Sequence, residues 1–495
     1  MKKQLFTLLI IQQLLFITNI KAQQDNLWTT EFGSRSAMVA GAVTASVRDN
    51  SAIYYNPGAL GFIKNSNIGL AANIVNYYTT YLEDGAGEGK NIYYPYLNFV
   101  PQFISGVVKS DKIPNITFTY AAFNKHQSKL NFFETYNESI DLFPQFVGDE
   151  GFSSTYKYKN EIVETWVGVG AGYLLNPNWS IGGTMFFSYR SEVSQESIDN
   201  VVFNNDKDIV ANTIFSDEFD LGQLAVLYKL GVAYQDEYIS WGATITTPGI
   251  RIGLFTGAML HRSENVIMPD KEDVYYSIIN EWTNAWYKHP WEFDTGVQFA
   301  MGGGTFNIRV AYILGVDTYT VAEFDDEAVI RSNTFIPVFP KKNAVKYSSR
   351  PVFNFAVGFE KKISDNIEIL SGFKIDRNVF DADKLDRSEY WVTTKSYWNL
   401  YTASIGADYK TKKNNNIIIG FSYRFTNRKG DRQIVNLTNP AVDNYLIGDR
   451  TNTANTNISG FSLVVGYTYN FGKPIKKDIR DKIHLDKLNP FEEEK

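Results

Sequence analysis

Apolar and polar residues alternate along most of the chain after Asn65, in segments of roughly ten to fifteen residues, about the length of a strand that crosses an outer membrane. In the clearest segment, Thr165 to Leu174, apolar side chains at alternate positions share one face and glycines share the other. Successive side chains of a strand point to opposite faces. Such a strand is typical of a transmembrane barrel, where the apolar face contacts lipid and the other face lines the lumen.

Short turns join these segments into hairpins, and long polar stretches separate the hairpins. The predicted hairpins are 97–109 with 115–134, 165–174 with 179–189, 224–234 with 239–247, 293–301 with 306–314, 353–362 with 367–375, and 399–410 with 416–425. The polar stretches, predicted as loops, are 136–159, 191–216, 260–273, 318–350, 378–395 and 427–457. Outer-membrane barrels alternate short periplasmic turns with long external loops in this way.

A first strand at 68–82 and a last strand at 460–471 complete the pattern. It predicts an all-β fold, a transmembrane antiparallel β-barrel of about 14 strands over residues 66–472.

Residues 1–22 have the features of a signal peptide. Lys2 and Lys3 precede an apolar stretch from Leu5 to Ile17, and Ala22 ends a segment suited to cleavage. The apolar stretch is too short to be a spanning helix; the alternative is an N-terminal core helix of an intracellular protein. We therefore expect export, cleavage near Ala22, and a place in the outer membrane of a Gram-negative bacterium.

The composition supports a barrel and excludes several other classes. Aromatic residues make up 15% of the chain and there are 36 glycines, which suits strands and their turns. The mean hydropathy of −0.24 excludes a bundle of spanning helices, since each would need about 20 apolar residues. The absence of cysteine excludes disulfides and thiolate metal sites. The net charge of −6 leaves no basic surface for nucleic acid.

The stretch between the cleavage site and the first strand does not alternate cleanly. Small residues from Gly33 to Ala42 are followed by an acidic residue, more small residues, two tyrosines and a turn sequence. This order resembles the N-terminal signature of the outer-membrane hydrophobic-compound transporters, the long-chain fatty acid transporter (FadL-type) family. The family's Asn-Pro-Ala-Gly-Leu stands here with Gly and Ala exchanged. The residues that carry the resemblance are Asp49, Ala52, Tyr54, Tyr55, Asn56, Pro57 and Gly58. Stretches 241–248 and 289–293 are similar to strand ends of the same family.

The resemblance implies that residues 23–65 fold inside the barrel as a hatch that blocks the lumen. A barrel of this size leaks unless its lumen is filled. The glycines and alanines of the segment suit close packing against a wall, and Pro57 presets a turn. The tripeptide from Asn56 to Gly58 alone would favour an ordinary surface turn; the length, position and composition of the whole segment favour the hatch.

No arrangement of residues indicates catalysis or a cofactor. Neither a nucleophile elbow nor a phosphate-binding loop is present. The acidic run 323–327 lacks the glycine and spacing of a calcium loop. The chain has four histidines, none spaced as metal ligands: His126, His261, His289 and His484. We therefore expect no enzymatic activity, no metal and no cofactor.

The leading hypothesis is transport of hydrophobic small molecules, long-chain fatty acids or similar, across the outer membrane. The ligand would be captured in an apolar groove among external loops, where burial contributes about 0.8 kcal/mol per CH₂, and would pass a movable hatch. Anchoring of the loops is an equal alternative for the candidate contact residues, which are Leu142, Phe143, Phe146, Phe335, Ile336 and Phe339.

The alternative function is that of a non-transporting barrel, a structural or docking subunit of an outer-membrane secretion or assembly complex. The charged segment 473–495 would be a disordered periplasmic tail, since it buries little apolar surface, or a docking tail for a periplasmic or outer-membrane protein. The other expected partners are outer-membrane lipid and lipopolysaccharide. The hatch-like segment disfavours a general porin.

Overall fold

The computed structural model describes residues 26–471 except 326–327, 332–343, 386–397 and 414. The expected signal peptide and the charged C-terminal tail lie outside the described residues. Within them, no helix is long and apolar enough to cross a membrane.

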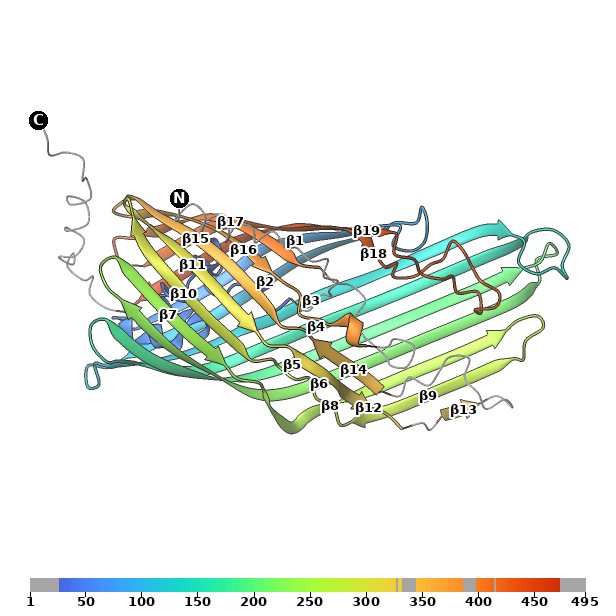
Figure 1. The fold of residues 1–495 in the computed structure, drawn as a ribbon, viewed down its shortest axis with the longest axis horizontal. Coiled ribbons are helices and arrows are strands. Elements are labelled where there is room, and N and C mark those ends of the chain that lie inside the picture. The colour runs from blue at the N-terminus through green and yellow to red at the C-terminus, as the bar shows by residue number, and fades with distance from the viewer. Residues whose placement is uncertain (1–25, 326–327, 332–343, 386–397, 414, 472–495) are drawn as a thin grey trace, which may run out of the picture.

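Fourteen antiparallel strands form a closed ring, which confirms the all-β barrel and its strand number (Figure 1). Strands that follow one another in the ring are hydrogen-bonded neighbours, and β19 closes the ring on β1 from Asn67↔Asn470 to Glu83↔Asn455. The ring consists of β1 (Asn67–Glu83), β2 (Ile92–Lys109), β3 (Ile116–Ile140), β4 (Glu150–Leu174), β5 (Trp179–Phe203), β6 (Ile209–Gln235), β7 (Ile239–Thr246), β10 (Glu292–Met301), β11 (Gly304–Ile313), β15 (Val352–Ser364), β16 (Ile367–Asp376), β17 (Leu400–Lys410), β18 (Asn416–Asp431) and β19 (Ala454–Asn470).

Additional strands extend the wall at one end of the ring. β8 (Ile250–Ile267) follows β7 and pairs with β6, while β9 (Val274–Thr283) pairs with β8 and with β13 (Ala328–Arg331). β12 (Val316–Glu323) and β14 (Ala344–Ser349) form a separate two-stranded sheet, and η2 (Ala382–Lys384) is a single 3-10 turn.

Two stretches that the sequence predicts as loops, 136–159 and 191–216, are mostly strand. They lengthen β3, β4 and β5 to 25 residues and β6 to 27, and only the tips at 141–149 and 204–208 are loops. Parts of 260–273, 318–350 and 427–457 are strand as well. At about 3.3 Å per residue these strands are near 80 Å long, far beyond an apolar band of about 25 Å.

The polarity of these extensions follows from what surrounds them. On β4 the exposed face is apolar from Tyr173 to Val163 and then changes to Glu161 and Lys159, while the buried face still carries large side chains such as Tyr158. The exposed face of the extension carries polar side chains because it lies in water, whereas the lower part of the same strand faces lipid. The polar residues of these two stretches therefore mark where the strands pass from lipid into water, and not where the strands end.

The leading segment, residues 26–63, lies inside the ring. It contains α2 (Ser34–Met38), α3 (Ala52–Tyr55) and the 3-10 helix η1 (Pro57–Phe62). α2 contacts β16 to β19, whereas η1 contacts β3 to β7 on another part of the ring. Val39, Ile53 and Leu60 are fully buried. The segment thus bridges the lumen between distant strands.

Glycines on the inner face of the wall let the leading segment approach the strands closely. A Cβ added to Gly58 would lie 2.8 Å from the backbone of Gly231 on β6, and a Cβ at Gly242 on β7 would overlap the carbonyl of Thr44. No real Cβ contact is that short, so backbone meets backbone here. The inner face of small residues, which the sequence pattern predicts, is the surface against which the leading segment packs.

Replacing Gly242 by valine is expected to lower the free energy of unfolding by about 1–3 kcal/mol, the usual cost of overpacking. Gly253→Val is the matched control, because a Cβ at Gly253 has no neighbour within 4 Å. The measurement is the temperature at which each variant loses its folded, fast-migrating form on electrophoresis. Equal transition temperatures for the two variants would contradict the close packing of the leading segment against Gly242.

Candidate functional site

The tripeptide Asn56-Pro57-Gly58 fastens the leading segment to β6. Asn56 Oδ1 accepts a hydrogen bond from the amide of Gly58 (2.9 Å), and Asn56 Nδ2 donates to the carbonyls of Thr44 (2.8 Å) and Val232 (3.0 Å). Pro57 begins η1. The turn is buried in the lumen, not at a surface.

The other four motif residues shape the leading segment itself. Asp49 Oδ1 accepts a backbone hydrogen bond (2.8 Å) just before α3, in which Ala52 is fully buried. The ring of Tyr54 packs edge-on against Phe32, with centroids 4.4 Å apart. The hydroxyl of Tyr55 accepts a hydrogen bond from the amide of Phe32 (3.2 Å). The structure therefore brings all seven motif residues into one unit, in which Asp49 is partly exposed and the other six are buried.

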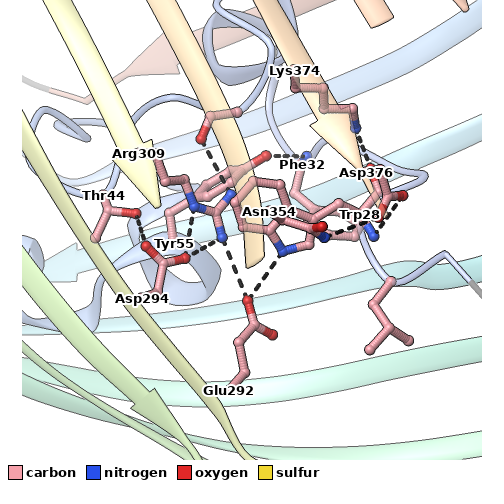
Figure 2. A network of polar contacts seen from close by, with 12 residues as sticks. Trp28, Phe32, Thr44, Tyr55, Glu292, Asp294, Arg309, Asn354, Lys374 and Asp376 are labelled. Atoms are coloured by element: carbon pink, nitrogen blue, oxygen red, sulfur yellow. Dashed lines mark hydrogen bonds and ion pairs between the residues drawn. The ribbon is translucent and has the colours of Figure 1, made fainter. Parts of the chain in front are cut away.

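A buried ion cluster joins this unit to β10 and β11 (Figure 2). Arg309 of β11 donates through Nε to Asp294 Oδ2 of β10 (2.7 Å) and through Nη1 to the carbonyl of Gly41 (3.2 Å). Thr44 donates to the other carboxylate oxygen of Asp294 (2.7 Å). The side chains of Arg309 and Asp294 are only 3% and 0% exposed. Removal of either charge would leave the other one buried without a partner, which destabilises the folded state.

Trp28 extends the cluster toward β15 and β16 (Figure 2). Its indole N–H donates to Glu292 Oε1 (3.2 Å) and its amide donates to Asp376 Oδ2 (3.0 Å). The guanidinium of Arg309 lies 3.7 Å from the centroid of its ring. Asn354 Nδ2 donates to the second oxygen of Asp376 (3.0 Å). The start of the leading segment is thus tied to β10 and β16 by hydrogen bonds to carboxylates and to β11 by the contact between Arg309 and the indole ring.

Sequence reasoning did not single out these charged residues, although a signal for some of them exists. Glu292 and Asp294 alternate with Phe293, which is exposed on the outer face, and Arg309 follows the exposed Ile308. A charge at every second position of an otherwise apolar strand faces the lumen, where it needs a partner. Which partner it finds depends on packing between segments hundreds of residues apart, and no sequence pattern predicts that.

The wall separates between β2 and β3. Their ladder runs only from Phe103↔Phe123 to Lys109↔Thr117, although β2 begins at Ile92 and β3 continues to Ile140. Beyond this ladder β2 pairs with β1 alone, and β3 pairs with β4 alone. Two strand edges are therefore without a ladder in the part of the chain that the structure describes.

A bulge in β3 and prolines in β2 account for the separation. The register of β3 against β4 shifts between Asn124 and His126, so that Lys125 and His126 are both buried on the inner side. A bulge of this kind bends its strand away from a neighbour. β2 contains Pro95 and Pro101, and proline, which cannot donate to a ladder, is found mainly in edge strands. These two prolines are a signal in the sequence from which the separation could have been predicted.

A cavity lies at this separation. About 1200 Å³ of empty space, including space open to solvent, is bordered by the leading segment, by Tyr94 and Tyr96 of β2, and by Gln127, Ser128 and Lys129 of β3. Consecutive strand residues point to opposite faces. A cavity that touches three of them in a row therefore reaches around the edge of β3 toward both of its faces.

Of the loop residues proposed as ligand contacts, the three that the structure describes do not border this cavity. Phe143 is 2% exposed and packs in a hydrophobic cluster with Leu446 of the β18–β19 loop, and Leu142 and Phe146 pack against the same cluster. These positions agree with the loop-anchoring alternative, while contact with a ligand stays a prediction. The remaining candidates lie outside the described residues: Phe335, Ile336 and Phe339.

Among the described residues no group of three acidic or histidine side chains could hold a metal ion. His289 Nε2 lies 2.9 Å from Glu164 Oε1 in the lumen, and His484 falls in the tail that is not described. The two later stretches noted in the sequence form β7 and its end, 241–248, and the approach to β10, 289–293.

No protein-family model matches the sequence, and no curated protein is detectably similar to it. Solved structures are similar in fold. A Pseudomonas aeruginosa FadL homologue is 12% identical with a TM-score of 0.55, and the alignment covers 92% of this chain and all of that chain. The Pseudomonas putida toluene transporter TodX is 11% identical with a TM-score of 0.55, covering 89% and 99%. A deltaS2 mutant of the TodX monoaromatic hydrocarbon channel is 13% identical with a TM-score of 0.59, covering 89% and 99%.

These comparisons confirm the fold that the N-terminal resemblance implied. The chain has the barrel architecture of FadL-type hydrophobic-compound transporters over most of its length. At this level of identity the likeness concerns fold alone.

Proposed function

We propose that this protein transports hydrophobic small molecules across an outer membrane. The observation that carries the proposal is the cavity that reaches around the edge of β3. It would give a solute a route into the lipid that avoids the occupied part of the lumen. The apolar, exposed outer face of the ring suits a lipid bilayer, and the leading segment would act as the hatch.

A hydrophobic solute would be favoured in free energy along the whole of this route, because it would stay out of water. Each CH₂ taken out of water contributes about 0.8 kcal/mol, and the solute would pass from tyrosine rings in the cavity to the lipid outside. Proteins of similar fold are described as transporters of toluene and channels for monoaromatic hydrocarbons, which supports this solute class. Long-chain fatty acids are a narrower form of the same proposal.

Joining β2 to β3 is expected to abolish most of the uptake. Gln127 Nε2 lies 3.5 Å from the hydroxyl of Tyr96 across the separation, and the chain has no native cysteine. We expect the Tyr96→Cys/Gln127→Cys variant, linked on cells by a long, flexible bismaleimide that spans the shortened side chains, to take up labelled toluene or oleate at a small fraction of the unlinked rate, because the lateral route is closed.

The matched control is a linked pair in a closed part of the wall. Tyr401 and Phe425 stack across β17 and β18 with centroids 5.6 Å apart, so Tyr401→Cys/Phe425→Cys accepts the same reagent without touching the cavity. Both pairs should carry equal amounts of cross-linker. Unchanged uptake in the linked Tyr96/Gln127 variant would overturn the lateral route.

No observation in the described residues favours the docking-subunit alternative, because its main support is the tail 473–495, which lies outside them. A stoichiometric partner retained in mild detergent, together with unchanged uptake of hydrophobic solutes when the gene is deleted, would favour that alternative over transport.

A further inference from the structure

The cavity at the β2–β3 separation contains polar atoms without partners. Among the described residues, Thr29 Oγ1, Ser128 Oγ and Arg424 Nε are buried without a hydrogen bond, and the ring of His126 has a backbone contact to Asn26 at one nitrogen alone. All four residues border the cavity. His126 and Ser128 are 4% and 6% exposed. A buried polar group left unpaired is costly to the folded state. Several of them around one cavity indicate a bound molecule that supplies the missing bonds.

These atoms lie at two ends of the cavity. Arg424 of β18 donates through Nη2 to the carbonyl of Thr29, so these two residues form one end. His126 and Ser128 of β3 form the other end. The leading segment runs from one end to the other, since Asn26 hydrogen-bonds His126 through its backbone and Thr29 lies three residues further on, a span of at most about 10 Å. A ligand that reaches both ends is therefore elongated.

Aromatic side chains occupy the wall between the two ends. Tyr94 and Tyr96 of β2 are nearly parallel, at 18°, with centroids 6.3 Å apart. Tyr78 of β1 lies beneath the guanidinium of Arg424, 5.0 Å from it. Aromatic side chains favour stacked or edge-on contacts with other rings. The middle of the cavity thus offers ring faces to a planar group, with polar side chains such as Asn76 and Asn98 beside them.

The β18 end is positively charged. Among the described residues Arg424 forms no direct ion pair, although the carboxylate of Asp376 lies near enough to interact with its charge. The other charged groups at the cavity are paired, Lys129 with Glu161 (2.6 Å) and Glu31 with Lys374. A guanidinium binds a carboxylate through strong, directional hydrogen bonds. The imidazole and hydroxyl at the β3 end can instead accept from and donate to a neutral hydroxyl group.

We propose that this cavity binds an elongated, planar aromatic acid that carries a hydroxyl group at the end opposite its carboxylate. The carboxylate meets Arg424 and Thr29, the ring lies along the tyrosines, and the hydroxyl meets His126 and Ser128. This assignment rests on the proposed transport function and narrows its substrate class. A plain hydrocarbon or a fatty acid would leave the polar atoms of β3 unpaired.

The test is calorimetric binding to the full chain in detergent, with p-coumarate, cinnamate and palmitate as probes. Cinnamate lacks only the hydroxyl group of p-coumarate. We expect p-coumarate to bind about tenfold more tightly than cinnamate to the wild type, the effect of one hydrogen bond to a buried partner. His126→Phe should remove this preference, so that the two acids bind with equal affinity, whereas Arg424→Gln should weaken both acids.

The ratio of the two affinities is measured on one folded protein, so a folding defect cannot imitate the result. His261→Phe and Arg251→Gln are matched controls on β8 that do not border the cavity. Equal affinity of the wild type for the two acids, or a preference that survives in His126→Phe, would overturn the assignment, and binding of neither acid would indicate that water alone fills the cavity.

Failure of this inference and failure of transport give different results. If cross-linking β2 to β3 stops toluene uptake but neither acid binds, the aromatic-acid site is wrong and transport stands. If p-coumarate binds as expected but cross-linking changes no uptake, the site stands and the transport route is wrong.

Discussion

Deletion of residues 26–63 is expected to turn the barrel into an open pore. The leading segment bridges the lumen, with α2 against β16 to β19 and η1 against β3 to β7. Barrels of about 8 strands are filled by their own side chains, whereas those of 16–18 strands hold an aqueous channel. A ring of fourteen strands lies nearer the second group. In planar bilayers we expect little current through the full chain and a large, steady current through the deleted variant.

The deletion should leave the wall able to form. The ring closes through the β1–β19 ladder, which begins at Asn67, beyond the deleted residues. Retention of the heat-modifiable folded form on electrophoresis verifies this for the variant. If the folded deletion variant stays closed to ions, the wall's own side chains seal the lumen, and the hatch role proposed for the leading segment is wrong.

The barrel itself could be predicted because its physical cause is local. Residues of one strand alternate between lipid and lumen, and this period of two is visible in any window such as 165–174. The six predicted hairpins correspond to strand pairs of the ring, and their turns are short as expected. Local alternation and turn residues together indicated the hairpins, and the resemblance to a family of fourteen-stranded barrels supported the strand number.

The height of the wall could not be predicted in the same way. The predicted loops 136–159 and 191–216 are strands because the alternation continues there with a polar exposed face. Tyr156 and Tyr158 still mark the buried face of β4. When a strand leaves the lipid, its exposed face changes from apolar to polar. In the sequence this change resembles the end of the strand, although only the surroundings of the strand have changed.

The site was predictable in part. Small residues and the turn at Pro57 indicated a segment that packs closely in a lumen, and they lie there. The ion cluster required contacts such as that between Trp28 and Glu292, which are 264 residues apart. The separation of β2 from β3 depends on a bulge at Lys125, which has no sequence signature, but Pro95 and Pro101 are visible signs of an edge strand.

Replacing Arg309 by methionine is expected to lower the free energy of unfolding by about 3–5 kcal/mol, because it leaves buried carboxylates without their cation. Asp294 is fully buried beside Arg309, and Glu292 Oε1 lies 3.6 Å from the same guanidinium. The change also removes the hydrogen bond to Gly41 and the stacking on Trp28. The leading segment should therefore loosen before the ring unfolds.

Two measurements separate these effects. The temperature at which the folded form is lost reports the ring, and the rate of proteolytic cleavage within residues 26–63 reports the segment. Arg309→Lys should fall between the wild type and methionine, because it keeps the charge but loses the planar fork. Thr44→Val, which removes one hydrogen bond to Asp294, should cost only about 1 kcal/mol. If Arg309→Met is no more sensitive to protease than Thr44→Val, the ion cluster does not hold the leading segment in place. Close packing against the glycines of the wall must then hold it instead.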